Sequence, residues 1–349
     1  MEQQRNIASL LPQELKELLA QMGEPAFRAE QIFSWIHQKT VSSYDEMSNL
    51  PAALRTKLAD AESFALPVPT QKQVSADGTV KYLLTLPDGN SVEAVLMSYN
   101  YGDSLCISSQ IGCRMGCRFC ASTMGGLVRN LTADEMAGEV YAVQKDSGRR
   151  VSHIVLMGIG EPLDNLDEVL RFLQIINHPK GQCLSMRNIS VSTCGLVPAI
   201  LSLAEKRLGI TLSVSLHAPD DETRSSMMPV NNRYPVVQLI NACREYQKRT
   251  GRRISYEYAM VRGVNDTPQM AEKLAFLLKG MGAHINLIPI NPVDGSPYGA
   301  SDRQAVLAFQ KMLQDFGMNA TVRRRLGVDI SAACGQLRRQ AIQEAGHEG

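Results

Sequence analysis

The stretch Gly112-Cys113-Arg114-Met115-Gly116-Cys117-Arg118-Phe119-Cys120 places three cysteines close together in the chain. A structural zinc site or an ordinary four-iron cluster is usually closed by four protein ligands. Three thiolates therefore leave one metal position free for a ligand from outside the protein. The stretch predicts an iron–sulfur site at which chemistry takes place, and it directs attention to the residues that would surround such a site.

The residues of this stretch also allow two other interpretations. Spacings of i, i+4 and i+7 would place the three cysteines on one face of a helix, as ordinary buried thiols. Gly112 and Gly116 disfavour that helix, because each glycine costs about 1 kcal/mol in a helix interior. The glycines favour a loop wrapped around a ligand. A zinc ion completed by a distant fourth cysteine is the second alternative.

Composition bounds the setting of this site. A chain of 349 residues can form one large α/β domain and a small one. Its eight cysteines are few for this length, no charged-then-apolar signal segment opens it, and no run of 18 apolar residues occurs. We expect a cytoplasmic protein without a membrane span, and a monomer.

The chain before residue 100 differs in pattern from the rest. Leucines and other apolar residues at helical spacing predict helices over residues 12–22, 28–39 and 54–60. Alternating apolar residues over 80–86 and 92–96, joined by the turn at 87–90, predict a β-hairpin. We expect an N-terminal helical domain (1–65), a hairpin and linker extension (66–100), a core domain (101–337) and a tail (338–349).

The core domain shows short β-rich runs that alternate with helical stretches. The predicted strands are 105–109, 152–157, 188–191, 211–215, 254–260, 285–288 and 320–323. The predicted helices are 133–145, 166–176, 197–206, 235–249, 270–281 and 303–316. This alternation predicts an α/β fold with a parallel sheet, which is either open or curled into a full or partial β/α barrel.

Polar and glycine residues gather where the predicted strands end. The cysteine loop, the segments 158–162, 192–195 and 215–217, and Asn291 each follow such a strand. The carboxyl ends of the strands form the face of a β/α barrel that carries active sites. Gly158 and Gly160 lack the third glycine of a dinucleotide-binding motif, which excludes that interpretation.

The spacing Cys113-x-x-x-Cys117-x-x-Cys120 resembles the signature of radical S-adenosylmethionine enzymes. Four segments, 104–113, 158–162, 215–218 and 332–337, resemble the bacterial adenine-C2 RNA methyltransferases, and the similarity runs from the N-terminal helices to about Leu337. The resemblance implies a partial parallel β/α barrel and a [4Fe-4S] cluster held by the three cysteines. It also implies that S-adenosylmethionine binds to the fourth iron and to the following residues: Gly160, Glu161, Ser192, Ser215, Leu216, His217 and Asn291.

The same resemblance implies the reaction and its partners. The family methylates carbon 2 of an adenosine in the peptidyl-transferase centre of 23S rRNA and of the adenosine 3′ of the anticodon in some tRNAs. An electron donor such as flavodoxin or ferredoxin would reduce the cluster, and the N-terminal helical domain would bind the RNA. The sister group, which methylates carbon 8 of the same rRNA adenosine and confers antibiotic resistance, is an alternative, and a non-catalytic zinc-binding RNA module with Cys106 as fourth ligand is another.

Three catalytic residues follow from the resemblance. Cys334 would first be methylated, and its methyl carbon would then be joined to the base by a radical route. Cys106 would release the product by attacking the sulfur of Cys334, which forms a transient disulfide. Glu93 matches the family's proposed proton acceptor, although strand alternation alone would point its side chain toward solvent. Cys183, Cys194 and Cys243 have no assigned counterpart, and we interpret them as structural.

Two groups of arginines suggest an anionic substrate. Arg114, Arg118 and Arg129 lie in a segment from 104 to 130 that contains no acidic residue, and residues 323–325 form an arginine triplet. Solvated charged surfaces are the alternative explanation for each group. Their nearness to the predicted metal loop favours contact with the phosphates of RNA.

Overall fold

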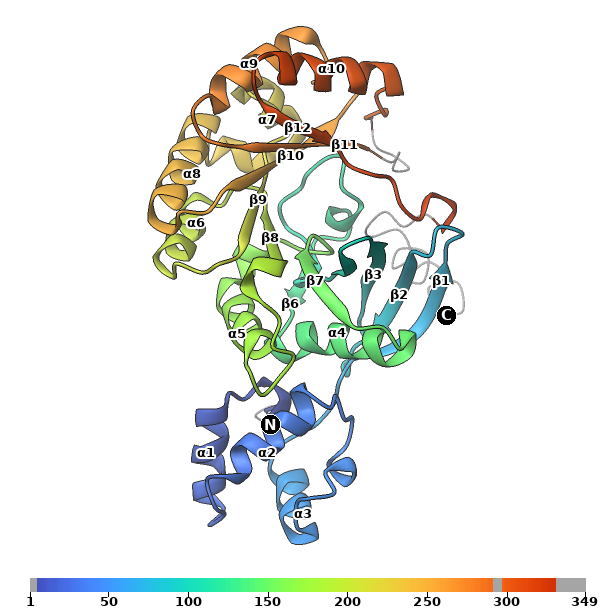
Figure 1. The fold of residues 1–349 in the computed structure, drawn as a ribbon, viewed down its shortest axis with the longest axis vertical. Helices are drawn as coiled ribbons and strands as arrows, with labels where there is room; N and C mark the ends of the chain where they lie inside the picture. Colours follow the sequence, from blue (N-terminus) through green and yellow to red (C-terminus); the bar gives the residue numbers. More distant parts are fainter. Residues whose placement is uncertain (1–4, 291–296, 331–349) are drawn as a thin grey trace.

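The computed structural model describes residues 5–290 and 297–330. Its largest element is a ten-stranded sheet in the order β1-β2-β3-β4-β7-β8-β9-β10-β11-β12 (Figure 1). The first four strands are antiparallel: β1 (Val68–Val74), β2 (Val80–Thr85), β3 (Ser91–Tyr99) and β4 (Gly102–Cys106). The predicted hairpin, β2 and β3, extends the main sheet, because β3 pairs with β4.

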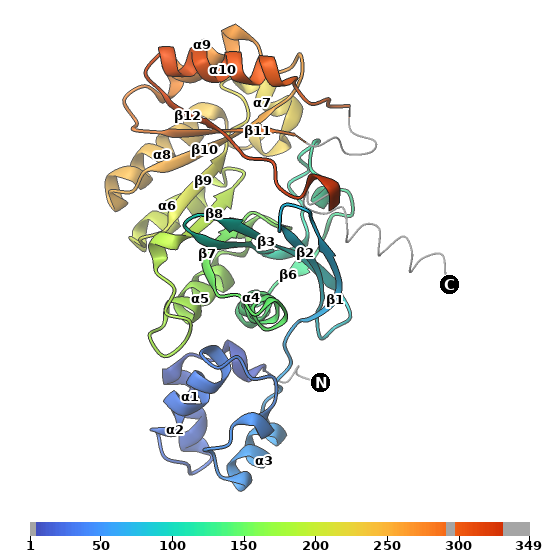
Figure 2. The same cartoon turned by 45° about the vertical axis from the view of Figure 1, so that its right-hand side comes forward.

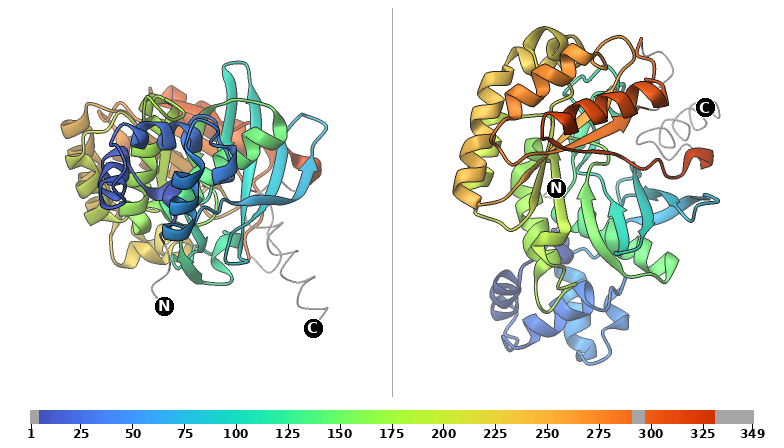
Figure 3. Two further views of the ribbon diagram at one scale, coloured as in Figure 1. Left: turned by 90° about the horizontal axis from the view of Figure 1, so that it is seen from below. Right: turned by 45° about the horizontal axis from the view of Figure 1, so that its top comes forward.

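The remaining strands of this sheet are parallel to β4. They are β7 (Val151–Leu156), β8 (Ile189–Thr193), β9 (Thr211–Ser215), β10 (Ile254–Met260), β11 (His284–Pro289) and β12 (Asn319–Val322). Helices cover the outer face of the curved sheet, which makes the parallel part a partial barrel (Figure 3). The helices are α4 (Ala133–Ser147), α5 (Leu166–Asn177), α6 (Val197–Glu205), α8 (Val236–Thr250), α9 (Pro268–Leu278) and α10 (Arg303–Asp315).

Three strands and one helix were not predicted from the sequence pattern. Strand β1 is mostly exposed and contains Pro69 beside a register shift, so it shows no apolar alternation. Helix α7 (Asp221–Met227) is a single short helix that begins at the capping residue Asp220. A separate two-stranded sheet, β5 (Gln110–Gly112) with β6 (Leu127–Asn130), closes the base of the cysteine loop.

Short 3-10 helices connect many of these elements. They are η1 (Ile7–Ser9), η2 (Tyr44–Glu46), η3 (Ala121–Thr123), η4 (Pro162–Asn165), η5 (Met186–Asn188), η6 (Pro229–Asn232) and η7 (Val328–Ile330). Segment η7 follows β12, which is the last strand in the sheet order. It lies beside the turn between β1 and β2, the two strands at the other end of that order (Figure 2).

The N-terminal helices α1 (Pro12–Gln21), α2 (Arg28–His37) and α3 (Ala52–Ala61) form a helical module below α4 and α5 (Figures 1 and 2). The module has a hydrophobic core of its own, in which Ile32, Phe33 and Leu58 are fully buried. Polar contacts join the module to the barrel helices, including a two-bond pair in which Arg171 donates to the carboxylate of Glu14 at 2.7 and 3.0 Å. Within the described residues, no helix has the length and apolar character that a membrane crossing requires.

Candidate active site

A cavity of about 400 Å³ opens at the carboxyl ends of the barrel strands. This volume lies in the range of small-molecule and cofactor sites. Ten of the residues predicted from sequence line it: Glu93, Cys106, Cys113, Cys117, Cys120, Gly160, Glu161, Ser192, Ser215 and His217. Leu216 does not line the cavity, because its side chain is buried in the main hydrophobic core. Asn291 and Cys334 lie outside the described residues.

The cysteine loop is not helical, as its glycines predict. Gly112 has a φ of +78°, a conformation that glycine adopts readily and other residues rarely do. This bend lets the N–H of Cys113 donate to the carbonyl oxygen of Gly126 at 2.9 Å. Thr123 donates its hydroxyl to the carbonyl oxygens of Cys117 and Cys120, at 3.2 and 2.9 Å. These hydrogen bonds within the loop hold its shape, and all three of its cysteines line the cavity.

Burial shapes the acidity of these thiols. It raises the pKa of Cys113 to about 12 and the pKa of Cys117 well above its ordinary value, with the neighbouring cysteines adding to both shifts. Thiolates gathered in this place need a cationic partner, and an iron–sulfur cluster supplies one. The donor set, three cysteines on one cavity wall, fits a cluster with one open iron position.

The cysteines are not arranged as a closed zinc site. Within residues 5–290 and 297–330, no group of three or more His, Cys, Asp or Glu side chains lies close enough together to hold a single metal ion, and this holds for the loop cysteines as well. All seven cysteines of the described residues are free thiols.

Glu161 joins two of the strand-end turns. Its carboxylate accepts from the N–H of Leu163 at 3.0 Å and from the N–H of Cys194, after β8, at 2.7 Å. Its own N–H donates to the side chain of Gln110 at 2.9 Å. Burial raises the pKa of Glu161, while these hydrogen bonds lower it. Both carboxylate oxygens of Glu161 accept hydrogen bonds from the protein, so this side chain holds two segments of the cavity wall together. Its backbone is the part that is left to bind a ligand.

His217 is held as a neutral imidazole. Its Nδ1 accepts from the N–H of Ala259 at 2.9 Å, and burial lowers the pKa of the ring to about 3. A neutral ring that accepts at Nδ1 carries its proton on Nε2. The ring meets Phe119 of the cysteine loop edge to face, with centroids 4.9 Å apart. His217 thus ties the end of β9 to the loop that holds the thiols.

Glu93 is buried, which corrects the expectation from strand alternation. Its side chain is 1% exposed and pairs with the fully buried Lys81 on β2, with 3.2 Å between Nζ and Oε2. The second face of β2 and β3 is covered by the barrel, so both faces of this hairpin are buried. Glu93 therefore places a carboxylate in the cavity wall, on the strand next to the one that carries Cys106.

Cys106 ends β4 and is half-buried in the same wall. Burial raises the pKa of its thiol to about 11. The charge of Arg323 and a hydrogen bond from the N–H of Met157 act in the opposite direction. Cys106 is therefore a thiol whose reactivity depends on its neighbours.

Two cavity residues were missed by the sequence analysis. Glu257 on β10 is 3% exposed, and its carboxylate accepts from Ser255 at 2.9 Å and from Asn286 at 2.7 Å. A single carboxylate inside the apolar run of β10 was the available signal. Cys194, interpreted as structural, also lines the cavity.

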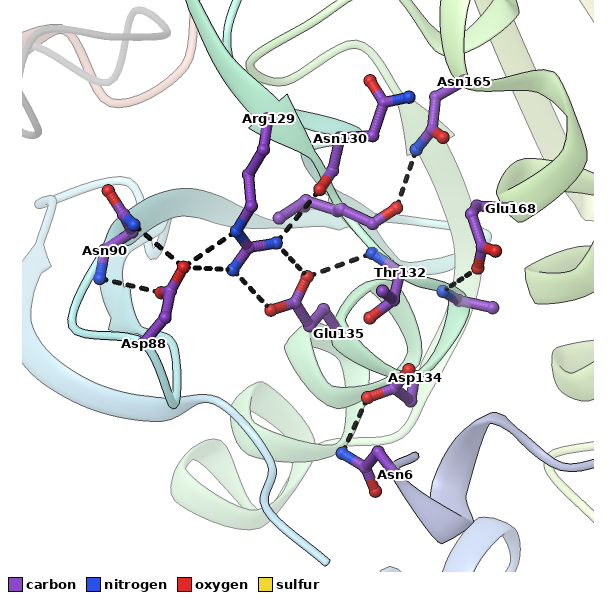
Figure 4. Close-up of polar contacts among 12 residues, drawn as sticks. Asn6, Asp88, Asn90, Arg129, Asn130, Thr132, Asp134, Glu135, Asn165 and Glu168 are labelled. Atoms are coloured by element: carbon purple, nitrogen blue, oxygen red, sulfur yellow. Dashed lines mark hydrogen bonds and ion pairs between the residues drawn. The ribbon is translucent and has the colours of Figure 1, made fainter. Parts of the chain in front are cut away.

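Most of the arginines around the cysteine loop form ion pairs with acidic side chains. Arg129 binds Asp88 and both oxygens of Glu135, which ties the β2–β3 turn to the start of α4 (Figure 4). Arg114 pairs with Asp164. Two of the three predicted anion-binding arginines are thus paired with carboxylates of the protein. Arg323, Arg324 and Arg325 line the cavity.

Comparisons with protein families agree with this geometry. Residues 5–63 match the family model described as ribosomal RNA large subunit methyltransferase N-terminal domain, and residues 107–275 match the radical SAM superfamily. A probable dual-specificity RNA methyltransferase RlmN from Lachnospira eligens is 49% identical over 97% of this chain and 97% of its own length. One of the same name from Clostridium perfringens is 50% identical over 98% of this chain and 99% of its own.

A solved structure gives the same result in three dimensions. The crystal structure of a radical SAM methyltransferase from Sphaerobacter thermophilus matches with a TM-score of 0.91 and 44% sequence identity. The match covers 95% of this chain and 98% of that one, so it includes both the helical module and the barrel. The chain therefore belongs to the RlmN family of radical SAM RNA methyltransferases.

Proposed function

We propose that this chain methylates carbon 2 of adenosine in 23S rRNA and in tRNA, with Cys334 and Cys106 as its reactive thiols. The observation that supports this proposal best is the cavity itself, in which the three loop cysteines face Cys106 and Glu93. The cluster cysteines and the extra cysteine come from separate segments of the chain, and the fold brings them to one site.

As a member of the radical SAM superfamily, the chain uses a [4Fe-4S] cluster and S-adenosylmethionine. Cys113, Cys117 and Cys120 would hold the cluster, and the backbone at Gly160 and the polar groups of Ser192, Ser215 and His217 would hold the cofactor. When bound, this pair supplies the methyl group and the radical that activates an unreactive ring carbon. An electron donor of the flavodoxin or ferredoxin type would reduce the cluster, and we expect the enzyme to act as a monomer.

The chain's own residues would position and move protons. Glu93 would take the proton that leaves carbon 2, and its pair with Lys81 holds the carboxylate in the cavity wall. His217, neutral and protonated on Nε2, would donate a hydrogen bond without adding charge. Cys106 would release the product by attacking Cys334.

The segment that precedes Cys334 is hydrogen-bonded to the turn between β1 and β2. The carboxylate of Asp329 accepts from the hydroxyl of Ser75 and, at 3.0 Å, from the N–H of Ala76. The N–H of Gly327 donates to Asp77 at 2.9 Å. These bonds fix the chain five residues before Cys334, on the same side of the barrel as the cavity that Arg323–Arg325 line.

Arg324 and Arg325 are exposed residues at this cavity, and they would contact phosphates of the substrate RNA. Reversing both charges should weaken RNA binding and reduce its dependence on salt, while the cluster stays bound. Unchanged methylation of full-length RNA at elevated salt would contradict this contact.

Mass spectrometry of the modified nucleoside tests the proposed function. RNA from cells that lack the gene should gain 2-methyladenosine in rRNA and tRNA when this chain is expressed, and a Cys334→Ala variant should not restore it. An 8-methyladenosine product would instead assign the chain the carbon 8 reaction. Anaerobically purified protein should also form 5′-deoxyadenosine when it receives reductant and S-adenosylmethionine.

A further inference from the structure

Arg323 is placed differently from the two arginines that follow it. It comes directly after β12, and its N–H donates to the carbonyl oxygen of Leu287 at 2.8 Å, which extends the pairing with β11. Its side chain is half-buried, whereas Arg324 and Arg325 are exposed. Arg323 is therefore the arginine of the triplet that the sheet holds inside the cavity.

The side chain of Arg323 reaches across the open edge of the barrel. Its Nη1 lies 4.0 Å from Sδ of Met157, the residue after β7, although β12 and β7 stand at separate places in the sheet order. Strand β7 pairs with β4, where Cys106 lies opposite Val155. Met157 also gives its N–H to the thiol of Cys106. One residue thus contacts both the guanidinium and the thiol.

The charged groups around Cys106 come from four elements. Glu93 on β3 and Glu139 on α4 disfavour a thiolate at this position, and Arg323 favours it. Glu93 is paired with Lys81 on β2, and Glu139 accepts the N–H of Ser108 with both oxygens, each at 3.2 Å. Across the cavity, Glu257 on β10 also interacts with the charge of Arg323.

We propose that Arg323 is a positioning residue for Cys106, and that its guanidinium, held beside Met157 and facing Glu257, increases the fraction of Cys106 present as thiolate. The inference rests on the proposed role of Cys106 in product release. There the thiolate attacks the sulfur of Cys334, and a disulfide bond forms as the bond from that sulfur to the bridging carbon breaks. The electron pair stays with the carbon, which takes a proton and becomes the methyl group. A cellular dithiol then reduces the disulfide.

This proposal assigns the first arginine a role that differs from RNA binding. A nearby positive charge favours the thiolate form of a cysteine. Removing the guanidinium should therefore raise the pKa of Cys106 and slow every reaction of its thiolate. Arg324 and Arg325 have the same charge and lie next to it in sequence, so they provide matched controls.

Alkylation of Cys106 tests the proposal without substrate RNA. The cluster-loaded protein is treated with a small thiol reagent over a range of pH, and peptide mass spectrometry follows the modification of Cys106 separately from the exposed Cys183. At a fixed pH well below the midpoint, Cys106 should react about tenfold more slowly in Arg323→Met than in the natural chain, which corresponds to a rise of about one unit in its pKa. Arg323→Lys, which keeps the charge, should recover most of the rate, and Arg324→Met and Arg325→Met should match the natural chain.

A pH midpoint of Cys106 that is the same in Arg323→Met and in the natural chain would overturn the proposal. So would an equal shift in all three methionine variants, because a general change in surface charge would explain it. Cluster absorbance checks that each variant is folded, and the pair Arg323→Lys and Arg323→Met keeps the test decisive if one variant loses its cluster. The role of Cys106 itself is tested separately, because Cys106→Ala should accumulate enzyme covalently joined to RNA.

Discussion

At the scale of single residues, Gly112 is the position on which the cysteine loop depends most. A Cβ at this position would lie 1.9 Å from the carbonyl oxygen of Gly126, and the φ of +78° disfavours any other residue. We expect Gly112→Ala to displace the loop and to reduce the iron bound per chain after anaerobic reconstitution. Gly116→Ala is the matched control, since φ there is +71° but the nearest atom, Cγ of Pro229, is 3.5 Å away. Equal iron content in both variants would contradict this explanation.

Breaking the buried pair of Lys81 and Glu93 by removing one of its members should destabilise the fold. Removing one member of a buried ion pair leaves an uncompensated charge and typically costs about 3–5 kcal/mol. We expect Lys81→Met to lower the free energy of unfolding by about 3 kcal/mol, as measured by urea unfolding. The double variant with Glu93→Gln should recover part of this loss, because no charge is then left unpaired. A loss below about 1 kcal/mol would show that Glu93 is compensated by other groups.

Single residues also show where sequence reasoning worked and where it failed. The loop cysteines and the strand-end residues Gly160 and His217 were predicted because their local pattern fixes their place in a β/α fold. Alternation alone placed the side chain of Glu93 on the solvent side, because the alternation rule assumes that one face of a hairpin is exposed to water. Both faces of this one are covered, and only the three-dimensional packing shows it. Glu257 was missed although it is a single carboxylate inside the apolar run of β10.

At the scale of elements, the segment η7 carries the chain toward Cys334. Asp329 anchors it to the β1–β2 turn, and Asp329 lies five residues before Cys334, the proposed reactive thiol. We expect Asp329→Ala to reduce product formation about tenfold or more, because small misplacements of reacting groups are costly. Asp315→Ala on α10, which removes the same charge from a surface pair with Lys311, is the control. Equal activity of the two variants, with equal cluster content, would rule out an anchoring role.

The elements themselves were largely predictable, and the exceptions have physical causes. Strands β9 and β10 match their predicted bounds, because they are buried, short and rich in residues that favour strands. Strand β1 could not be predicted, since an exposed strand leaves no apolar pattern. The ion pairs of Arg114 with Asp164 and of Arg129 with Asp88 could not be predicted, because the acidic partners lie far from these arginines in sequence.

At the scale of the whole molecule, the docking of the helical module on the barrel depends on pairs that are distant in sequence. The pair of Arg171 and Glu14 is one, and the bond from Asn6 to Asp134 at 2.7 Å is another. No local pattern identifies such partners. The module could be predicted from its helices, but the face that it presents to α4 and α5 could not.

His37 makes this docking sensitive to pH. It is fully buried at the interface, its Nδ1 lies 2.8 Å from the hydroxyl of Tyr141 on α4, and burial lowers its pKa to about 3. Between that value and the ordinary pKa near 6.5, the unfolded chain binds a proton that the folded chain excludes. The free energy of unfolding should therefore fall as the pH decreases through this window, by up to about 1.4 kcal/mol per pH unit for this residue.

Urea unfolding at pH 5 and pH 7 measures this effect, with the fluorescence of Trp35 as the signal. Trp35 is the single tryptophan of the chain and lies on α2, so it reports on the module. His37→Gln, which retains a hydrogen-bonding group but does not titrate, should lose less stability than the natural chain between the two pH values. The buried His217 is present in both proteins, so its contribution cancels. If the two proteins lose the same stability, another group causes the acid sensitivity, and His37 does not couple the docking of the module to pH.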